Sequence, residues 1–440
     1  MNIINLEALG TSIDSKNASS SYMPVRTNYN DCDWNSVSAL FVSYALGLEL
    51  KSYCIEDFEA ECELVFKEKL DKESFWSVLK KAYFDNQDLF KVAPQCLLLK
   101  TNKKLINPPD QRVATVLRSL LGNVQIEFDA EHQLNFIENV FINILKKKWK
   151  ERSQITLDDP YLPFISDCFK GDAKFLASRP NYLLEQLSSF LALYTFLYTS
   201  QLALNLPEWK AGEPKAKPLY FILDTEKASS ERIDIKNSGW ESFKNSAQAI
   251  FPLLSMLEVL QLVGTPKKPL WDIASKLQEC ADDSDYREAL RDYAQRFQKE
   301  RGIVKDMPDG QSALEWLENL LQLGCDQFDK HFADPTSTRY QANQKVVSGI
   351  VEYISAGFVQ NRRRGGNVLV LTQDNLLLLT NIAIGTADRL RLAELIEAFE
   401  SRGVFFDKQT QQRLVDFYER IGNVERMSDS GEAVYVRKTI

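Results

Sequence analysis

Two aspartates and a lysine in the middle of the chain have the residue types that metal-dependent cleavage of a phosphodiester requires. Asp224 ends the apolar run 219–224, which is typical of a β-strand, and Asp234 and Lys236 lie on a short β-like run soon after it. Two carboxylates can hold Mg²⁺, and a lysine can orient or activate the attacking water. The spacing therefore makes Asp224, Asp234 and Lys236 candidates for a catalytic site.

The same three residues have a plainer interpretation. The order acid, acid, any residue, lysine occurs in many restriction-type nucleases, but Leu223 stands where that pattern often has proline, and the gap is short. Carboxylates are also common in the turns that follow strands. So loose a pattern recurs by chance in a chain with 61 acidic residues. Catalysis is therefore the alternative here, and we expect neither a bound metal nor another cofactor.

The segment 408–421, near the C-terminus, carries side chains suited to contact with nucleic acid. Leu414, Val415, Tyr418 and Ile421 fall on one face at helical spacing, which leaves the opposite face to solvent. Gln and Arg can read base edges, and Lys and Arg can neutralise phosphates. The candidates on this helix and on the strand after it are Lys408, Gln409, Gln412, Arg413, Arg420 and Arg426.

Acidic side chains on the same helix and hairpin oppose DNA contact. Phosphate repels carboxylates at close range. The acidic residues concerned are Asp416, Glu419, Asp429 and Glu432. The alternative is that this segment contacts protein.

Two basic runs offer further contacts with a nucleic-acid backbone. Arg362, Arg363 and Arg364, followed by two glycines, could order on phosphates, whereas a solvated charged linker is the alternative. The run 146–150 surrounds Trp149, an aromatic side chain that could stack on a base. That run also ends a helix, where cations complement the macrodipole, and this second explanation is favoured.

The elements around the 408–421 helix have a recognisable order. A short alternation at 389–392 leads into a helix to about Ser401, and a turn at Gly403 precedes the second helix, which Asp407 caps. A hairpin over 423–437 follows, with turn chemistry at 429–431. Another helix, capped by Thr372 and ending at Gly385, comes before them. Strand, helix, helix and hairpin predict a winged helix-turn-helix.

Helical spacing dominates the rest of the chain. We expect helices at 56–66, 74–84, 133–149, 250–263, 271–280, 285–301 and 312–323. The predicted class is mainly α, multidomain, with a few strands. The predicted divisions are an N-terminal helical domain over 1–155, a central mostly helical domain over 156–360 with short strands near 219–236, a basic hinge over 361–366 and a winged-helix domain over 367–440.

Composition narrows the class of protein. The chain has 440 residues, 44% hydrophobic and 26% charged, which is ordinary for a globular protein. A net charge of −8 gives no overall basic field, although acidic and basic residues nearly balance from Arg362 onward. Seven scattered cysteines and two histidines argue against zinc fingers and disulfide scaffolds, and there is no Walker A motif for ATP.

Two features bear on location. The N-terminus lacks the basic and apolar regions of a signal peptide, which predicts a cytoplasmic protein. The uncharged stretch between Glu185 and Glu208 has the length of a membrane span. It also carries many polar side chains, so we expect a buried central helix and no membrane contact.

Segments of the C-terminal part resemble the DptG family of the DNA phosphorothioation-dependent restriction system. They are 376–385, 402–407 and 428–436, and the run 221–227 and the chain length are also similar to that family. The resemblance implies a subunit of a bacterial defence complex that attacks unmodified DNA. It also implies DptF-like and DptH-like partners with ATPase or helicase-like functions, and it assigns no catalytic residue.

The main hypothesis is a non-catalytic subunit, DNA-associated or an adaptor, in such an anti-phage restriction complex. It contacts DNA directly or through the complex. One alternative is a Mg²⁺-dependent nuclease subunit that uses Asp224, Asp234 and Lys236. The other is a purely protein-binding scaffold.

Overall fold

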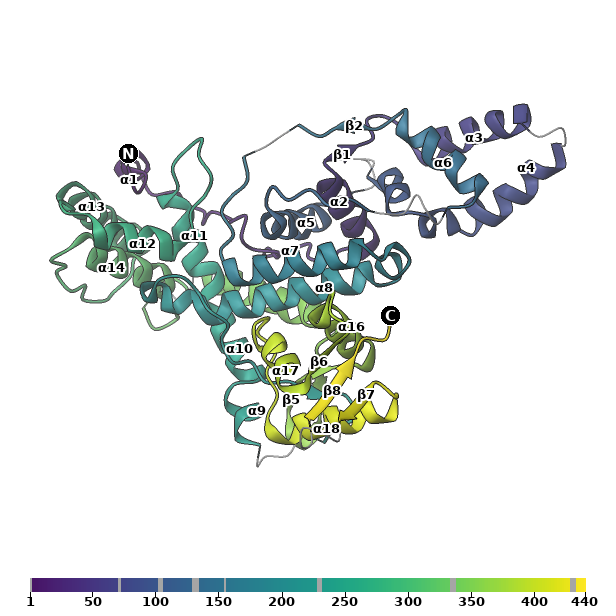
Figure 1. Ribbon diagram of the computed structural model, residues 1–440. Helices are drawn as coiled ribbons and strands as arrows, with labels where there is room; N and C mark the ends of the chain where they lie inside the picture. Colours follow the sequence, from purple (N-terminus) through teal and green to yellow (C-terminus); the bar gives the residue numbers. More distant parts are fainter. Residues whose placement is uncertain are drawn as a thin grey trace.

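A computed structural model describes residues 2–69, 73–101, 106–128, 134–153, 156–227, 232–332, 338–427 and 433–440. Helices make up 61% of the structure and strands 6%, which confirms the predicted mainly α class with a few strands. The molecule has the outline of a T (Figure 1). A helical arm and a helical lobe form the crossbar, and the C-terminal elements form the stem.

A long buried helix, α8 (Pro180–Asn205), runs through the centre beside α7 (Pro163–Ala177) (Figure 1). Its side chains from Phe190 to Ala203 are almost all inaccessible to solvent. In the part of the chain described, Pro180–Ala211 is the one helical segment long and apolar enough to cross a membrane. Because 78% of its most apolar window is buried inside the protein, the prediction of a buried central helix is confirmed.

The N-terminal third forms the centre and arm of the crossbar. α2 (Trp34–Leu46) and α5 (Pro108–Leu121) pack on each other and on α8. Beyond them the arm has its own core, in which rings such as Phe58, Phe66 and Phe141 meet edge to face. The arm consists of α3 (Ile55–Lys69), α4 (Glu73–Leu79), η1 (Lys80–Asp85), η2 (Asp88–Lys91), η3 (Pro94–Lys100) and α6 (Phe136–Lys146), and its base is the antiparallel pair β1 (Leu48–Glu49) and β2 (Lys150–Glu151).

The opposite lobe is built from helices close to those that the sequence predicts. Its longest members, α13 (Ser284–Arg301) and α14 (Ala313–Asp326), pack along each other. The other helices of the lobe and its junction with the body are α1 (Leu6–Gly10), α10 (Trp240–Ser246), η6 (Ala247–Ala249), α11 (Ile250–Leu260), α12 (Leu270–Glu279), α15 (Arg339–Gly349) and η7 (Ile350–Ile354). Helix η5 (Leu206–Ala211) continues from α8.

A small sheet joins the middle of the chain to its C-terminal part. β5 (Asn367–Leu371) lies between β3 (Ile222–Leu223), which is parallel to it, and β4 (Val359–Asn361), which is antiparallel. Of the predicted hinge, 361–366, Asn361 is the last residue of β4, and 362–366 form the loop that connects β4 to β5. This loop includes the short helix η8 (Arg363–Gly365). The Arg362 N–H donates to the Gly366 carbonyl across this loop at 2.7 Å.

The prediction of a β-like run at Asp234–Lys236 is wrong, because these residues lie in the short helix α9 (Ile233–Asn237). The physical reason is that β3 has no free edge. One edge pairs with β5, and on the other the Phe221 N–H donates to the Phe405 carbonyl at 2.9 Å. The Tyr220 N–H instead donates to the carbonyl of Ser238, the residue that follows α9.

The C-terminal module, 373–437, has the predicted order of elements. It contains α16 (Gln373–Ile384), β6 (Arg389–Arg391), α17 (Leu392–Glu400), α18 (Lys408–Arg420), β7 (Val424–Met427) and β8 (Ala433–Arg437). The three strands form an antiparallel sheet in the order β6-β8-β7. As predicted, the Thr372 and Asp407 side chains accept hydrogen bonds from the first turns of α16 and α18. The predicted turn at 429–431 lies outside the described residues.

The apolar face of α18 differs in part from the prediction. Leu414 and Tyr418 are buried as expected, but Phe417 joins them, and Ile421 is 37% exposed. α18 ends at Arg420, so Ile421 lies beyond the last helical turn. Thr410, Leu414, Phe417 and Tyr418 recur at intervals of four, three and one, which places them on one helical face.

The C-terminal module and the central helices share one core. The main cluster of buried side chains includes residues from Ile4 to Val436. The Asn381 amide in α16 donates to the Tyr182 hydroxyl in α8 at 2.9 Å. The positions of the domain boundaries stay a prediction.

Gly403 is the point where the turn between α17 and α18 comes closest to α8. Its φ is +83°, and a Cβ added there would lie 2.4 Å from the Gln201 Nε2. Gln201 cannot move away freely, because its amide donates to the Lys217 carbonyl at 2.9 Å and accepts from the Lys217 N–H at 2.8 Å. A glycine is therefore required at this position for two separate reasons.

We expect Gly403→Ala to lower the free energy of unfolding by about 2–4 kcal/mol, measured by urea denaturation. About 1–2 kcal/mol comes from the left-handed backbone, and the rest from the hydrogen bonds that Gln201 would lose. Gly422→Ala is the matched control, since its φ is +75° and nothing lies within 4 Å of the added Cβ. An equal decrease in the free energy of unfolding of the two variants would show that the Gln201 contact does not contribute to stability.

Candidate functional site

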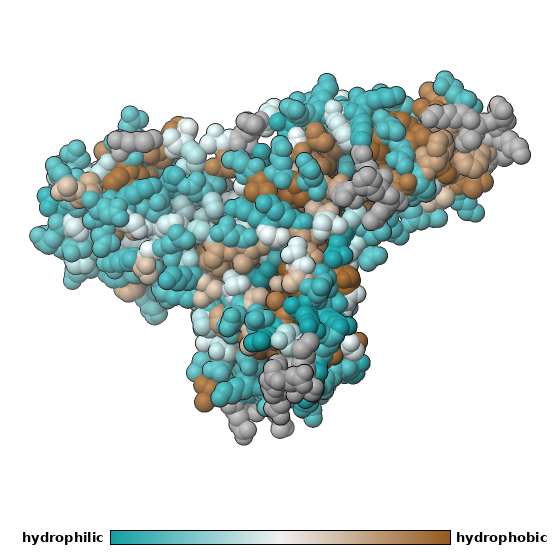
Figure 2. Space-filling view, viewed as in Figure 1, coloured by the Kyte–Doolittle hydropathy of each residue, from teal (hydrophilic) through white to brown (hydrophobic). Residues whose placement is uncertain are grey.

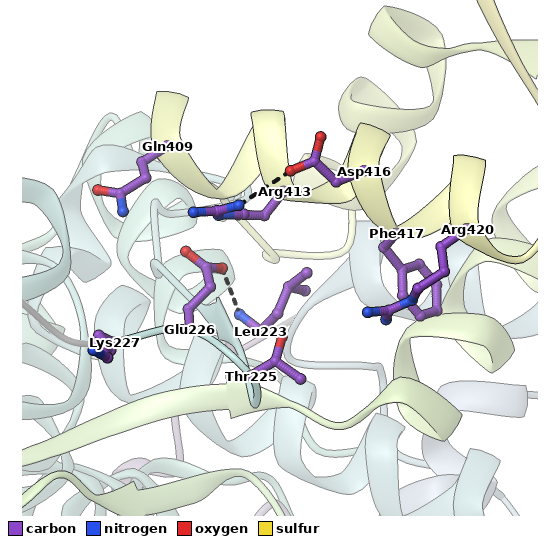
Figure 3. A pocket seen from close by; sticks show the side chains of 9 residues that line it. All are labelled: Leu223, Thr225, Glu226, Lys227, Gln409, Arg413, Asp416, Phe417 and Arg420. Atoms are coloured by element: carbon purple, nitrogen blue, oxygen red, sulfur yellow. Dashed lines mark hydrogen bonds and ion pairs between the residues drawn. The ribbon is translucent and has the colours of Figure 1, made fainter.

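A pocket of about 500 Å³ lies between α18 and the loop that follows β3. Leu223, Thr225, Glu226 and Lys227 form one side, and the other comes from α18: Gln409, Arg413, Asp416, Phe417 and Arg420. Figure 3 shows α18 above this loop, with Phe417 directed toward the loop and Asp416 directed away from it. The volume is within the usual range for ligand sites, roughly 300–1,000 Å³.

The burial of α18 decides which of its side chains are available. Because Thr410, Leu414, Phe417 and Tyr418 face the core, the opposite face is open to solvent. Its exposed residues are Lys408, Gln409, Gln412, Arg413, Asp416, Glu419 and Arg420. All five candidate contact residues that the sequence places on this helix are therefore on its exposed side, and three of them line the pocket.

A buried network holds the pocket's two sides together. The Arg232 guanidinium donates from Nε to Asp407 Oδ2 at 2.7 Å and from Nη1 to Glu226 Oε2 at 2.9 Å. It also contacts the Thr410 hydroxyl, which lies 3.2 Å from Glu226 Oε2. Glu226 in turn accepts from the Leu223 N–H at 2.9 Å, so the loop has a fixed position against the first turn of α18.

The charges around the pocket are partly compensated. Arg413 pairs with Asp416 at 3.2 Å, and Arg426 on β7 pairs with Glu419 (Figure 3 shows the first of these). Arg420 lies over the Phe417 ring at 5.7 Å, and in the described part of the chain neither it nor Lys227 has an acidic partner. The two helical acids expected to repel DNA are thus neutralised, while two cations stay available. Asp429 and Glu432 lie outside the described residues.

The arginine run at 362–364 does not line this pocket. Arg362 is half-buried, and its Nη2 donates to the Asp224 carbonyl at 2.6 Å. Arg363 is exposed, with a φ of +53°. The side chain of Arg364 lies outside what the structure describes.

The three candidate catalytic residues lie on two different elements. Asp224 follows β3 directly, and its Oδ1 is buried without a hydrogen bond. Asp234 and Lys236 are exposed on α9. Among the described residues, no group of three or more His, Cys, Asp and Glu side chains is arranged to hold a metal ion. The nuclease alternative gains no support from this geometry and stays a prediction.

The C-terminal sheet brings together basic residues that the sequence does not show as a group. Arg389 and Arg437 are direct neighbours on β6 and β8, and both pair with Glu425. The Arg391 Nε donates to the Tyr435 hydroxyl at 3.1 Å. The alternation of Arg389 and Arg391 around Leu390 was the available signal, because it puts both arginines on one face of a strand.

No protein-family model matches the chain, and no curated protein matches it significantly. The side chains described above are therefore the basis on which a function can be argued.

Proposed function

We propose that 367–440 is a winged helix and that the protein is a non-catalytic, DNA-associated subunit of a bacterial restriction complex. The observation that carries the DNA contact is the exposed face of α18, where glutamine and arginine side chains border a pocket with available cations. The complex, acting on DNA without phosphorothioate, is inferred from the resemblance of the C-terminal segments to the DptG family.

The winged-helix interpretation is supported by how the strands and helices connect. α17 and α18 follow β6, and the β7–β8 hairpin returns so that β8 lies between β6 and β7. In such a module the second helix can enter a major groove. Gln409, Gln412 and Arg413 are then the residues that reach base edges, and Arg420, Arg426 and Lys408 reach phosphates.

The charge balance predicts weak binding by this subunit alone. Arg413 and Arg426 share their charge with acidic neighbours, so few uncompensated cations face the DNA. Stable association then depends on partners, which we propose are DptF-like and DptH-like subunits. The arm offers a surface for them, because Leu64, Val78 and Phe136 are 62–65% exposed. Figure 2 shows hydrophobic side chains at the surface of the arm.

We expect Arg413→Ala/Arg420→Ala to weaken binding of duplex DNA by the full-length protein. Each lost phosphate contact should reduce the slope of log K against log salt by about one, so the loss of Arg420, the phosphate contact of this pair, reduces the slope by about one. Fluorescence anisotropy over a salt series measures both quantities. The loss of Arg413 should also reduce the difference in affinity between duplexes of different sequence, because this residue is proposed to reach base edges.

Arg291→Ala/Lys299→Ala is the matched control, because it removes the same charge from α13, on the opposite lobe (Figure 1). This control should leave the slope unchanged. If both double variants lose the same affinity, only net charge matters and the α18 site is wrong. If neither changes binding, the module contacts protein instead of DNA.

A further inference from the structure

We propose that a second pocket, in the N-terminal half, binds a single phosphate-sized oxyanion. This pocket has a volume of about 140 Å³ and is enclosed by four segments: residues 21–22, α2, α5 and residues 156–158. Figure 1 places α2 and α5 in the crossbar and α18 at the foot of the stem, so the two pockets belong to different parts of the molecule.

Two guanidinium groups lie over one tyrosine ring, and one of them, that of Arg118, lines this pocket. Arg118 and Arg152 lie over Tyr44, with Cζ atoms 4.7 and 4.6 Å from the ring centroid. Arg152 donates to the Ser43 hydroxyl at 2.7 Å, whereas Arg118 has no acceptor within the described residues. Burial and the nearby Arg152 both lower the pKa of Arg118. Because Arg152 repels the charge of Arg118, an anion in the pocket would offset that repulsion.

Several polar groups of the pocket are unused donors, although Ser21, Tyr22, Gln111 and Thr115 already donate within the protein. The buried Tyr44 hydroxyl accepts from Gln111 Nε2 at 2.7 Å, which leaves its own proton free to donate. Ser119 and Thr156 also line the pocket, and neither hydroxyl donates to another group in the described chain. Together with Arg118 they form a donor-rich wall from two helices and one loop.

The one carboxylate of the pocket is already satisfied. Asp158 accepts from the Ser21 hydroxyl at 2.7 Å through Oδ2 and from the Lys267 N–H at 3.1 Å through Oδ1. Its charge is thus engaged by the Ser21 hydroxyl, which also lines the pocket, and by the Lys267 N–H, and neither contact depends on a ligand. The unused donors of the pocket lack hydrogen-bond acceptors. An oxyanion supplies several acceptor oxygens on one small group.

The volume of the pocket limits the class of ligand that it can hold. A water molecule occupies roughly 30 Å³ in the liquid, so 140 Å³ accommodates a group of several heavy atoms. It is below the roughly 300 Å³ at which pockets for drug-sized ligands begin, and too small for a whole nucleotide. Inorganic phosphate and one phosphate of a DNA backbone share the required chemistry. Gln111 and Thr156 are exposed, so the pocket is open to solvent for either source.

The test is thermal unfolding and calorimetric titration of the full-length protein with sodium phosphate, against sodium chloride at equal ionic strength. We expect saturable binding and a rise in Tm with phosphate only. Arg118→Met should abolish the saturable part, and Tyr44→Phe, which removes one donor with little change in shape, should weaken phosphate binding several-fold. Circular dichroism checks that both variants fold. No saturable binding by the native protein, or equal binding by folded Arg118→Met, overturns the proposal.

Two further experiments distinguish free phosphate from a DNA backbone phosphate, and this pocket from the α18 site. If phosphate competes with duplex DNA in the native protein but not in Arg118→Met, a backbone phosphate occupies the pocket; if it does not compete, free phosphate does. Arg413→Ala/Arg420→Ala should keep phosphate binding even where DNA affinity is lost. Loss of phosphate binding in that double variant would place the anion at α18 and refute this pocket.

Discussion

Replacing Arg402 by methionine is expected to lower the free energy of unfolding by about 3–5 kcal/mol, because it leaves Asp172 as a buried charge without a counter-charge. Arg402 follows α17, and its Nε and Nη2 donate to the two carboxylate oxygens of Asp172 in α7 at 2.9 and 2.6 Å. Both residues are under 10% exposed. Urea denaturation at neutral pH measures the loss.

The same pair holds the C-terminal module on the central helices. Burial alone lowers the pKa of Arg402, but the Asp172 carboxylate more than offsets this and raises it above its usual range. Tyr194 in α8 also donates to Asp172, so three helical regions meet at one carboxylate.

The control is Arg413→Met, which breaks an exposed pair with Asp416 and should cost about 0–1 kcal/mol. In the double variant Arg402→Met/Asp172→Asn, the loss should be smaller than the sum of the two single losses. Simple additivity, or a loss below about 1 kcal/mol for Arg402→Met, would mean that the pair does not stabilise this contact.

Arg232→Met should have an effect of similar size, about 3–5 kcal/mol at neutral pH, since it leaves two carboxylates without a counter-charge. Glu226 is 6% exposed, and both Glu226 and Asp407 contact this one guanidinium. The variant also frees the loop 223–227 from α18, which changes the pocket. Urea denaturation gives the stability, and the anisotropy assay for DNA shows whether the α18 site needs a fixed loop.

The loss of stability in Arg232→Met should depend on pH in a defined direction. Burial raises the pKa of Asp407, but hydrogen bonds from Arg232 and from the Thr410 N–H outweigh it, so the pKa is lowered. A carboxylate with a lowered pKa stabilises the fold above its unfolded pKa, about 3.9, and loses that contribution as pH falls through its folded pKa. The difference between native protein and Arg232→Met should therefore be full near neutrality and shrink below about pH 4. A difference independent of pH would exclude the Asp407 contact as its source.

Local signals were sufficient for most individual elements. Asp407 and Thr372 mark helix starts because an N-cap needs only a short side chain and the next turn of backbone. The outward face of α18 followed from helical spacing, since the side chains one or two turns apart share a face whatever packs against them. The segment 234–236 was one exception, because a short run of mixed residues has no local preference strong enough to decide.

From the sequence alone we could place many of the helices, the N-caps Thr372 and Asp407, and the side of α18 that carries Gln409, Arg413 and Arg420. What faces that side depends on the tertiary structure. Arg232 and Asp407 are 175 residues apart, and Asp172 and Arg402 are 230 apart. No periodicity links such pairs, because their contact depends on how whole helices pack. The same is true of Tyr44, Arg118 and Thr156, three polar residues that the sequence leaves unremarkable and the fold brings to one pocket.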